Sequence, residues 1–422
     1  MKKIIITFIL SILVSLPVQA QVVHVTLEQA VNIAMENNLN LKSQRKQIDE
    51  LKEEIKIANA LKNPQFQSNF LMGKVTRGNS SQFGLAVPVE VGKRGIRKKI
   101  AQTNLEIVEN KIRAVEHDLK IRVMKDYFNI LYMKSVVKIL QDREKLFKNM
   151  KSVAEHKPKN SPNYEIDVLQ ADMKYQKQLV FLNKAKANLI IAQFRLNDTL
   201  DVPHSDIMYD TAESSLFLDN LSILDLHLLP YEEIEETAMK YSYSLAIAES
   251  NIQKSEQEIS QAKRKRIPDV TVGGGYAYQT AHQTGNEALP GAYVGAWMDL
   301  PLFYTYGPEI RKAKVTYERK KLDKGSFENH LRYALKQDYN KFKYAKVNMA
   351  HYQQILKESK SILNTHAQRY QKGQSSFLNL MQVETMHQES IRDYIEAMQE
   401  YYEAYLDLMH NVGHDILLET SL

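Results

Sequence analysis

The residues of this chain that could do chemistry are twelve histidines and many carboxylates, with no cysteine among them. Imidazole and carboxylate groups bind transition metals when several of them converge. One pair, His410 and His414, has the i, i+4 spacing that places two imidazoles on one face of a helix. Gly413 interrupts that helix, and no glutamate between the two histidines could act as a general base. The other histidines are scattered, so we expect neither a metal site nor a cofactor.

Nucleotide-binding and nucleophilic motifs are also missing from the sequence. The glycine run 273–275 follows the start of a strand pattern, whereas a nucleotide-binding loop follows the end of a strand and opens a helix. No P-loop lysine follows it, and no serine, histidine and aspartate carry the local signature of a catalytic triad. Helix packing explains the methionines near the C-terminus better than metal binding does: Met381, Met386, Met398 and Met409. We therefore predict that the chain is not an enzyme.

The elements that position these residues occur in two similar copies. Residues 27–64 and 231–268 align without a gap, and each stretch ends at a proline. Further matches follow in the same order, 88–92 with 301–304 and 167–170 with 379–382. A long internal duplication of this kind indicates one architecture built from two halves.

The N-terminus has the pattern of an export signal. Lys2 and Lys3 precede an apolar run over residues 4–16 and a small-residue site that ends at Ala20. We expect residues 1–20 to be a secretory signal peptide, because the apolar run is short for an N-terminal membrane anchor. Since the chain has no cysteine, an exported product would be held together by packing or oligomerisation, without disulfides or a lipidated cysteine.

Charge and hydropathy exclude two further classes. The net charge of +6 is mild, and the lysines are spread among glutamates, which is typical of solvated helix surfaces. We therefore expect no nucleic-acid partner. No later stretch of about 20 apolar residues predicts a transmembrane helix.

Apolar periodicity predicts the same order of elements in each copy: a helix, a β-hairpin, a very long helix, a tip turn and a returning helix. In the first repeat, 21–212, we expect them at about 26–61, 65–91, 95–156, 157–162 and 163–196. In the second repeat, 231–412, the opening helix precedes a hairpin at about 269–301, a long helix at 308–371, a turn at 372–375 and a returning helix at 376–412. A linker, 198–230, joins the repeats, and the tail 413–422 carries no clear signal. Each long helix would reach on the order of 95 Å and form an antiparallel coiled-coil hairpin with the helix that follows.

The four strands have the length and alternation of tilted membrane-spanning strands. Their aromatic residues would suit the membrane interface: Phe66, Phe83, Tyr276, Tyr278, Tyr293 and Trp297. A small soluble four-stranded sheet is the alternative. In a membrane, a sheet must close on itself so that every backbone group is paired, and the smallest barrels have about eight strands. Three chains would supply twelve strands and an open pore, so the sequence favours a ring-forming oligomer.

The ordered set of motifs resembles the TolC-type outer-membrane efflux proteins. The resemblance rests on the opening 27–38, the step at Asn63 and Pro64, and the turn that contains Tyr370, Gly373 and Ser376. It implies a mainly α fold with a small β part, in which long helical hairpins of a homotrimer form an α-barrel tunnel and four strands per chain contribute to a twelve-stranded transmembrane β-barrel. It also implies a location in the outer membrane, in contact with its lipid and extending into the periplasm. The expected function is the exit duct of a tripartite pump with a periplasmic adaptor and an inner-membrane transporter.

The stretch 88–101 is similar to the motif of the heavy-metal (CzcC/CusC-like) branch of this family. That similarity implies a transporter of the RND type and heavy-metal cations as cargo. The stretch could equally be a strand end, a glycine turn and a helix start. A duct for drug efflux or type I secretion remains an alternative, as does a structural periplasmic coiled-coil protein without a pore.

The resemblance also points to the helical tips as the gate. Family members often carry an aspartate pair after the glycine of the second tip turn, where this chain has Asn379 and Gln382. Asp167 and Asp172 occupy the matching region of the first copy. Whether the neutral pair abolishes an acidic gate stays open at this point, as does whether Tyr370 latches helices or fills the core. The full set of gate candidates is Tyr164, Asp167, Asp172, Tyr370, Gly373, Asn379 and Gln382.

Overall fold

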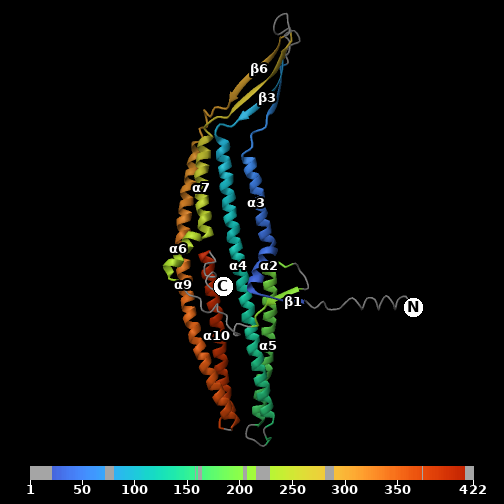
Figure 1. Cartoon of the computed structure of the whole chain (residues 1–422), viewed down its shortest axis with the longest axis vertical. Coiled ribbons are helices and arrows are strands. Elements are labelled where there is room, and N and C mark those ends of the chain that lie inside the picture. The colour runs from blue at the N-terminus through green and yellow to red at the C-terminus, as the bar shows by residue number, and fades with distance from the viewer. Residues whose placement is uncertain are drawn as a thin grey trace, which may run out of the picture. The chain divides into compact units, whose positions relative to one another are not determined.

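The computed structural model is mainly helical with a small β part, as expected (Figure 1). It describes residues 21–71, 80–156, 158–159, 164–202, 207–214, 229–280, 289–372 and 374–413. The expected signal peptide, the hairpin turns 72–79 and 281–288, and most of the first tip turn lie outside these residues. The chain divides into two compact units. One comprises Met1–Lys42, Ala114–Ser242 and Leu331–Leu422, and the other comprises Ser43–Arg113 and Tyr243–His330.

The unit made of Ser43–Arg113 and Tyr243–His330 contains a four-stranded antiparallel sheet in the order β2-β3-β5-β6 (Figure 1). The strands are β2 (Gln65–Leu71), β3 (Ser80–Val89), β5 (Val270–Gln279) and β6 (Leu289–Met298). Each copy of the duplication provides one hairpin, and the hairpins join through β3 and β5 in a register that pairs Val89 with Val270. The duplication therefore yields one continuous sheet.

Alternation gives the sheet two different faces. Phe83, Tyr276 and Ala292 are cross-strand partners on one face, which is apolar. On the other face Gly84, Gly275 and Tyr293 are partners, and small or polar residues predominate. Because successive side chains of a strand point to opposite faces, this register fixes the face of every residue in the sheet.

The other unit is built on long helices that pack through an aromatic core. Helix α4 (Lys93–Glu155) and α9 (Gly307–Gln371) enter it from Ala114 and Leu331 onward, and they are joined by α5 (Tyr164–Thr199) and α10 (Phe377–Val412). The four largest fully buried side chains of this unit come from these helices: Tyr127, Tyr401, Tyr402 and Phe342. Phe128 stacks on Tyr402 with ring centroids 4.5 Å apart. Aromatic stacking of this kind adds to the stabilisation from burial.

The linker contains a strand that periodicity does not predict. Strand β4 (Ile207–Thr211) pairs in parallel with β1 (Gln21–Val25). Each strand has five residues, and the partners are far apart in sequence, so neither produces a recognisable alternation. Lys134 of α4 secures this pair, with its ammonium 2.9 Å from the Asp210 carboxylate and 2.8 Å from Thr211 Oγ1.

The opening helix of each copy is broken, which corrects the single helix expected over 26–61. Helix α2 (Leu27–Asn37) ends before Asn38, whose ψ of 111° leaves the helical region, and α3 (Leu39–Ala58) begins after it. Asn38 Oδ1 accepts a hydrogen bond from the backbone of Leu41 at 2.8 Å and so caps the new helix. In the second copy Ser242 breaks α6 (Tyr231–Tyr241) from α7 (Tyr243–Arg264) in the same way. The apolar spacing continues across both breaks, so periodicity alone does not reveal them.

The long helices lie close to the ranges that the sequence predicts. Helix α4 begins two residues before the expected start at 95, and α5 ends three residues after the expected end at 196. Among the residues that the structure describes, no helix combines the length and apolar character needed to cross a membrane.

Candidate functional site

The first candidate site is the apolar face of the sheet, which is open to solvent in the isolated chain. Val294 is 87% exposed, Phe66 69% and Leu85 59%. Phe70 and Phe83 meet edge to face on the same surface, with centroids 5.3 Å apart. A contiguous exposed apolar surface is rare on monomeric soluble proteins and marks a surface that another apolar phase or chain covers.

The six aromatic residues predicted for the membrane interface divide between the two faces. Phe66, Phe83, Tyr276 and Tyr278 lie on the apolar face. Tyr293 and Trp297 lie on the opposite face, where their partners are Gly275 and Thr271. Odd and even positions within one strand point to opposite faces. Which positions of neighbouring strands share a face depends on the register between the strands, and the sequence alone does not give that register.

Glycines on this second face make room for the two rings. A Cβ on Gly273 would lie 2.6 Å from the Trp297 ring, and one on Gly84 would overlap the Tyr293 hydroxyl. A Cβ on Gly275 would overlap the carbonyl oxygen of Phe83. Tyr293 and Trp297 are therefore packed over a glycine-lined surface, on the face opposite to Phe66 and Phe83.

The second candidate site is the junction between the sheet and its helices, where the stretch 88–101 lies. Arg97 donates from Nε to the carbonyl oxygen of Ala58 at 2.7 Å and from a terminal nitrogen to Glu90 at 2.9 Å. Lys62 lies 3.7 Å from Glu90 and 3.3 Å from Asp269, and Lys93 lies 2.8 Å from Asp269. These five charged residues (Lys62, Glu90, Lys93, Arg97 and Asp269) form the junction cluster.

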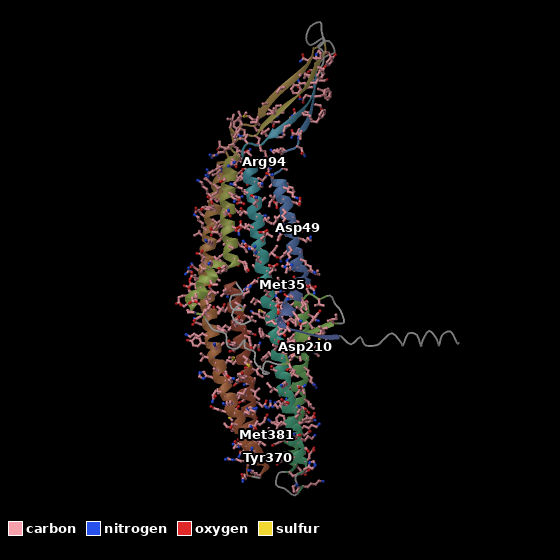
Figure 2. All side chains as sticks on the ribbon, viewed as in Figure 1. Met35, Asp49, Arg94, Asp210, Tyr370 and Met381 are labelled. Atoms are coloured by element: carbon pink, nitrogen blue, oxygen red, sulfur yellow. The ribbon has the colours of Figure 1, made fainter. Side chains whose placement is uncertain are left out.

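The junction cluster ties the end of β3 to the start of β5 and to the helix ends. Burial raises the pKa of Asp269, but hydrogen bonds and charges from Lys93 and Lys62 outweigh it and hold the pKa below its usual value. Gly92 has a φ of +68°, and Arg264 donates to its carbonyl oxygen. The turn therefore requires glycine, because other residues adopt a positive φ only with strain. The conspicuous motif of this stretch thus has a structural role in the chain, and Figure 2 marks its position at Arg94.

The third candidate site is the tip of the helical hairpins. Phe147, Met150, Leu380 and Met381 form a buried cluster there, and Tyr370 packs against it. Figure 2 shows Tyr370 and Met381 close together near the ends of α9 and α10. Tyr370 therefore contributes to the core of the tip.

The other predicted tip residues occupy three different settings. Tyr164 opens α5 and donates to the carbonyl oxygen of Glu155 at 3.4 Å. Asp172 accepts from Lys151 at 2.6 Å, and this hydrogen bond lowers the pKa of Asp172 and raises that of Lys151. Asp167 is half-buried in the first turn of α5, where a carboxylate interacts favourably with the helix dipole.

In the second tip, neutral residues take the equivalent positions. The backbone of Asn379 donates to Ser376 Oγ at 3.2 Å, so Asn379 serves the N-cap of α10. Gln382 is exposed and lines a groove with Met173, Leu378 and other residues of α5 and α10. The predicted gate residue Gly373 lies outside the described residues.

A buried ion pair joins α4 to α10, and nothing in the sequence pattern predicts it. Arg143 Nε lies 3.2 Å from a carboxylate oxygen of Glu384, which is fully buried, while the Arg143 side chain remains 22% exposed. Burial raises the pKa of Glu384, although the charge and hydrogen bond of Arg143 act in the opposite direction. The two residues are far apart in sequence, so only the fold brings them together.

Metal-binding geometry is limited to isolated contacts. Among the described residues, no group of three or more histidine, aspartate or glutamate side chains is arranged to hold a metal ion. His410 lies 3.0 Å from the Asp118 carboxylate and stacks on His117. His414 lies outside the described residues.

Residues 236–414 match the family described as outer membrane efflux protein. Over 280 residues the chain is 22% identical to the cobalt-zinc-cadmium resistance protein CzcC of Cupriavidus metallidurans, and the alignment covers 66% of this chain and 63% of that protein. The fold is similar to that of the outer membrane channel CmeC of Campylobacter jejuni, with a TM-score of 0.74 and 14% identity over 92% of this chain and 85% of CmeC. It is also similar to CusC, with a TM-score of 0.69 and 14% identity over 94% of this chain and 92% of CusC.

Proposed function

We propose that this chain, whose residues 236–414 match the outer membrane efflux protein family, is a member of that family and the outer-membrane channel of a tripartite efflux pump. It acts as a passive duct and carries out no enzymatic reaction. Cargo passes from an inner-membrane transporter and a periplasmic adaptor through the duct to the exterior.

The two-faced sheet is the observation that carries this proposal. One face exposes large apolar side chains such as Val294 and Phe66, and the other is lined by glycine and polar residues. The first face contacts lipid, and the second face lines an aqueous lumen. This pairing of faces is the pattern of transmembrane β-barrels.

The edges of the sheet indicate how the barrel closes. In the strand order β2-β3-β5-β6, the outer strands β2 and β6 each have one edge that pairs with no other strand of the described residues. Unpaired backbone groups are costly in lipid, so β6 of one copy must pair with β2 of the next. Three copies give a twelve-stranded barrel, and their helical hairpins form the tunnel that extends into the periplasm.

The cargo is assigned to heavy-metal cations on the similarity to the cobalt-zinc-cadmium resistance protein. The corresponding transporter is of the RND type. We expect the strand face towards the lumen to select cargo poorly, because apart from Tyr293 and Trp297 it carries mainly glycine and other small or uncharged residues.

The helical tips form the gate. Side-chain packing, instead of a ring of acidic residues, keeps the tips closed. Asp172 is engaged with Lys151, Asn379 and Gln382 are neutral, and Tyr370 packs into the tip cluster. Tyr164, Asp167 and Gly373 are the remaining gate candidates. Contact with the adaptor separates the two hairpins, so the gate is a packed element with two arrangements that a partner biases.

Single-channel conductance of the purified protein in a planar bilayer tests the duct. We expect trimers in detergent, outer-membrane fractionation and a stable conductance. A periplasmic coiled-coil spacer would give no conductance and would overturn the proposal. Growth of a deletion strain in cobalt, zinc and cadmium salts then tests the cargo, and we expect the strain to be sensitive to these metals. Sensitivity to drugs, or a loss of protein secretion, without metal sensitivity would assign the duct to another pump.

A further inference from the structure

The connection between β6 and α9 is longer than its counterpart in the first copy. Residues 299–306 join these elements, whereas residues 90–92 join β3 to α4. The longer connection projects apolar side chains outward, with Leu302 73% and Phe303 104% exposed. Such exposure in an ordered connection needs an explanation.

The backbone of this connection is held in place. Leu302 donates its N–H to the carbonyl oxygen of Leu300 at 2.8 Å. Arg266 Nε donates to the carbonyl oxygen of Thr305 at 2.9 Å. Tyr304 and Tyr306 meet edge to face with centroids 5.1 Å apart. The exposed side chains thus stand on a fixed support.

A run of four basic residues, 263–266, lies at the end of α7 beside this connection. Lys265 pairs with Glu309 at 2.6 Å. Arg264 and Arg266 donate to the carbonyl oxygens of Gly92 and Thr305, which carry no net charge to cancel theirs. Lys263 is exposed. Among the described residues, no carboxylate forms an ion pair with Lys263, Arg264 or Arg266, so the apolar segment is bordered by positive charge, and Asp299 is the one acidic residue within the connection itself.

We propose that the connection 299–306 is an interfacial anchor that binds anionic phospholipid. Leu302 and Phe303 enter the acyl region of the leaflet that lies nearest the helices. Lys263 and Arg266 bind the phosphate groups in the headgroup layer of the same leaflet. The inference rests on the proposed position of the sheet in the outer membrane, and it adds a lipid-binding site in the connection outside the strands.

Continuity with the apolar face favours lipid over a second copy of the chain. Val294 and Met298 lie on that face, and the exposed side chains of Leu300, Leu302 and Phe303 follow within five residues of the end of β6, where the chain turns. The surface that faces lipid in the sheet thus extends into the connection. Basic side chains at its border suit headgroups because long cationic side chains keep their charge in the polar layer while their stems lie on apolar surface.

Spin labelling tests the apolar half of the proposal, since the chain has no natural cysteine. A nitroxide on Phe303→Cys, in the full-length trimer reconstituted in lipid nanodiscs, is expected to collide more with oxygen, which dissolves in lipid, than with a water-soluble nickel chelate. The matched label on Lys52→Cys of α3 is expected to show the reverse. Low collision with both reagents at 303 would assign the segment to a neighbouring copy, and preferential collision with nickel would leave it in water. Either result overturns the anchor.

Charge removal tests the headgroup half. In nanodiscs of phosphatidylethanolamine with phosphatidylglycerol, native mass spectrometry is expected to find phosphatidylglycerol retained by the trimer. Lys263→Gln with Arg266→Gln should weaken this retention by roughly five-fold per charge. Lys46→Gln with Lys52→Gln removes the same charge from α3, at about 18 Å and about 9 Å along the helix from its end at Ala58, and should leave retention unchanged. Equal effects of the two variants would refute a specific site. A wild-type protein without conductance would count against the proposed duct instead, so the two failures are distinguishable.

Discussion

At the scale of single residues, Arg143 and Glu384 of the buried ion pair contribute unequally to the free energy of unfolding. The arginine reaches solvent, while the carboxylate is fully enclosed. Removing the arginine leaves an uncompensated buried charge, whereas removing the carboxylate leaves a cation that can hydrate. We expect Arg143→Met to lower the free energy of unfolding by on the order of 3 kcal/mol at neutral pH, and Glu384→Gln to cost less. The double variant Arg143→Met with Glu384→Leu should recover most of the loss in a denaturation experiment, and no recovery would mean that the pair is not the cause.

The raised pKa of Glu384 predicts how the stability of the protein changes with pH. The pKa of this carboxyl group in the folded protein is raised, so the folded state binds a proton more tightly than the unfolded state does. The stabilisation is complete below the unfolded pKa of about 4.3 and is lost as the pH rises through the folded value. The difference in thermal midpoint between wild type and Glu384→Gln should therefore shift against the wild type as the pH increases from about 4. A difference that stays constant with pH would contradict the shift.

Glycines in the sheet give a matched pair of substitutions on one face. A Cβ on Gly275 would overlap the Phe83 carbonyl, whereas a Cβ on Gly291 would meet nothing within 4 Å. Gly275→Val should destabilise the sheet by on the order of 3 kcal/mol or more, because a strand neighbour must move. Gly291→Val should assemble normally. Heat-stable trimers on a gel provide the measurement, and similar behaviour of the two variants would mean that the close approach is unimportant.

At the scale of elements, the two helix breaks make the duplication testable. Asn38 and Ser242 occupy matching positions and both end one helix before the next begins. Asn38→Ala removes the cap at Leu41 and should cost about 1 kcal/mol. Asn38→Ser places the residue of the second copy at the first break and should be nearly neutral. Hydrogen exchange at the start of α3 reports the difference, and a serine variant as frayed as the alanine variant would argue that the cap is not what holds the break.

Elements with a strong period could be predicted from the sequence, and elements that depend on distant partners could not. The pattern predicts a long helix from 308, and α9 begins at Gly307, because Pro308 suits the first turn of a helix and no proline follows within it. Strands β1 and β4 are too short to show alternation, and each forms only because it pairs with the other. The tip residues could be located from the turn pattern, but the contact of Asp172 with Lys151 and the packing of Tyr370 required the fold. Their roles in gating remain predictions.

At the scale of the whole molecule, three copies would convert the two faces of one sheet into the outside and inside of a pore. Val294 and Gly295 are neighbours in β6 at the same depth, and they point to opposite faces. Val294→Arg would place a charge against lipid at a cost of about 2–4 kcal/mol in each copy near the middle of the bilayer. Gly295→Arg would place the same charge in the aqueous lumen, where a Cβ meets only ordinary contacts from the Trp297 ring.

We therefore expect Val294→Arg to be lost from the outer-membrane fraction, while Gly295→Arg assembles and conducts. Because three lumen arginines would repel cations, the conductance of Gly295→Arg should shift towards anion selectivity, most clearly at low salt where screening is weak. Reversal potentials in a salt gradient measure this shift, with Gly291→Gln as a neutral control on the same face. The opposite pattern, with Val294→Arg inserted and Gly295→Arg lost, would mean that the glycine-lined face is covered by protein, and that the apolar face packs against another chain instead of lipid.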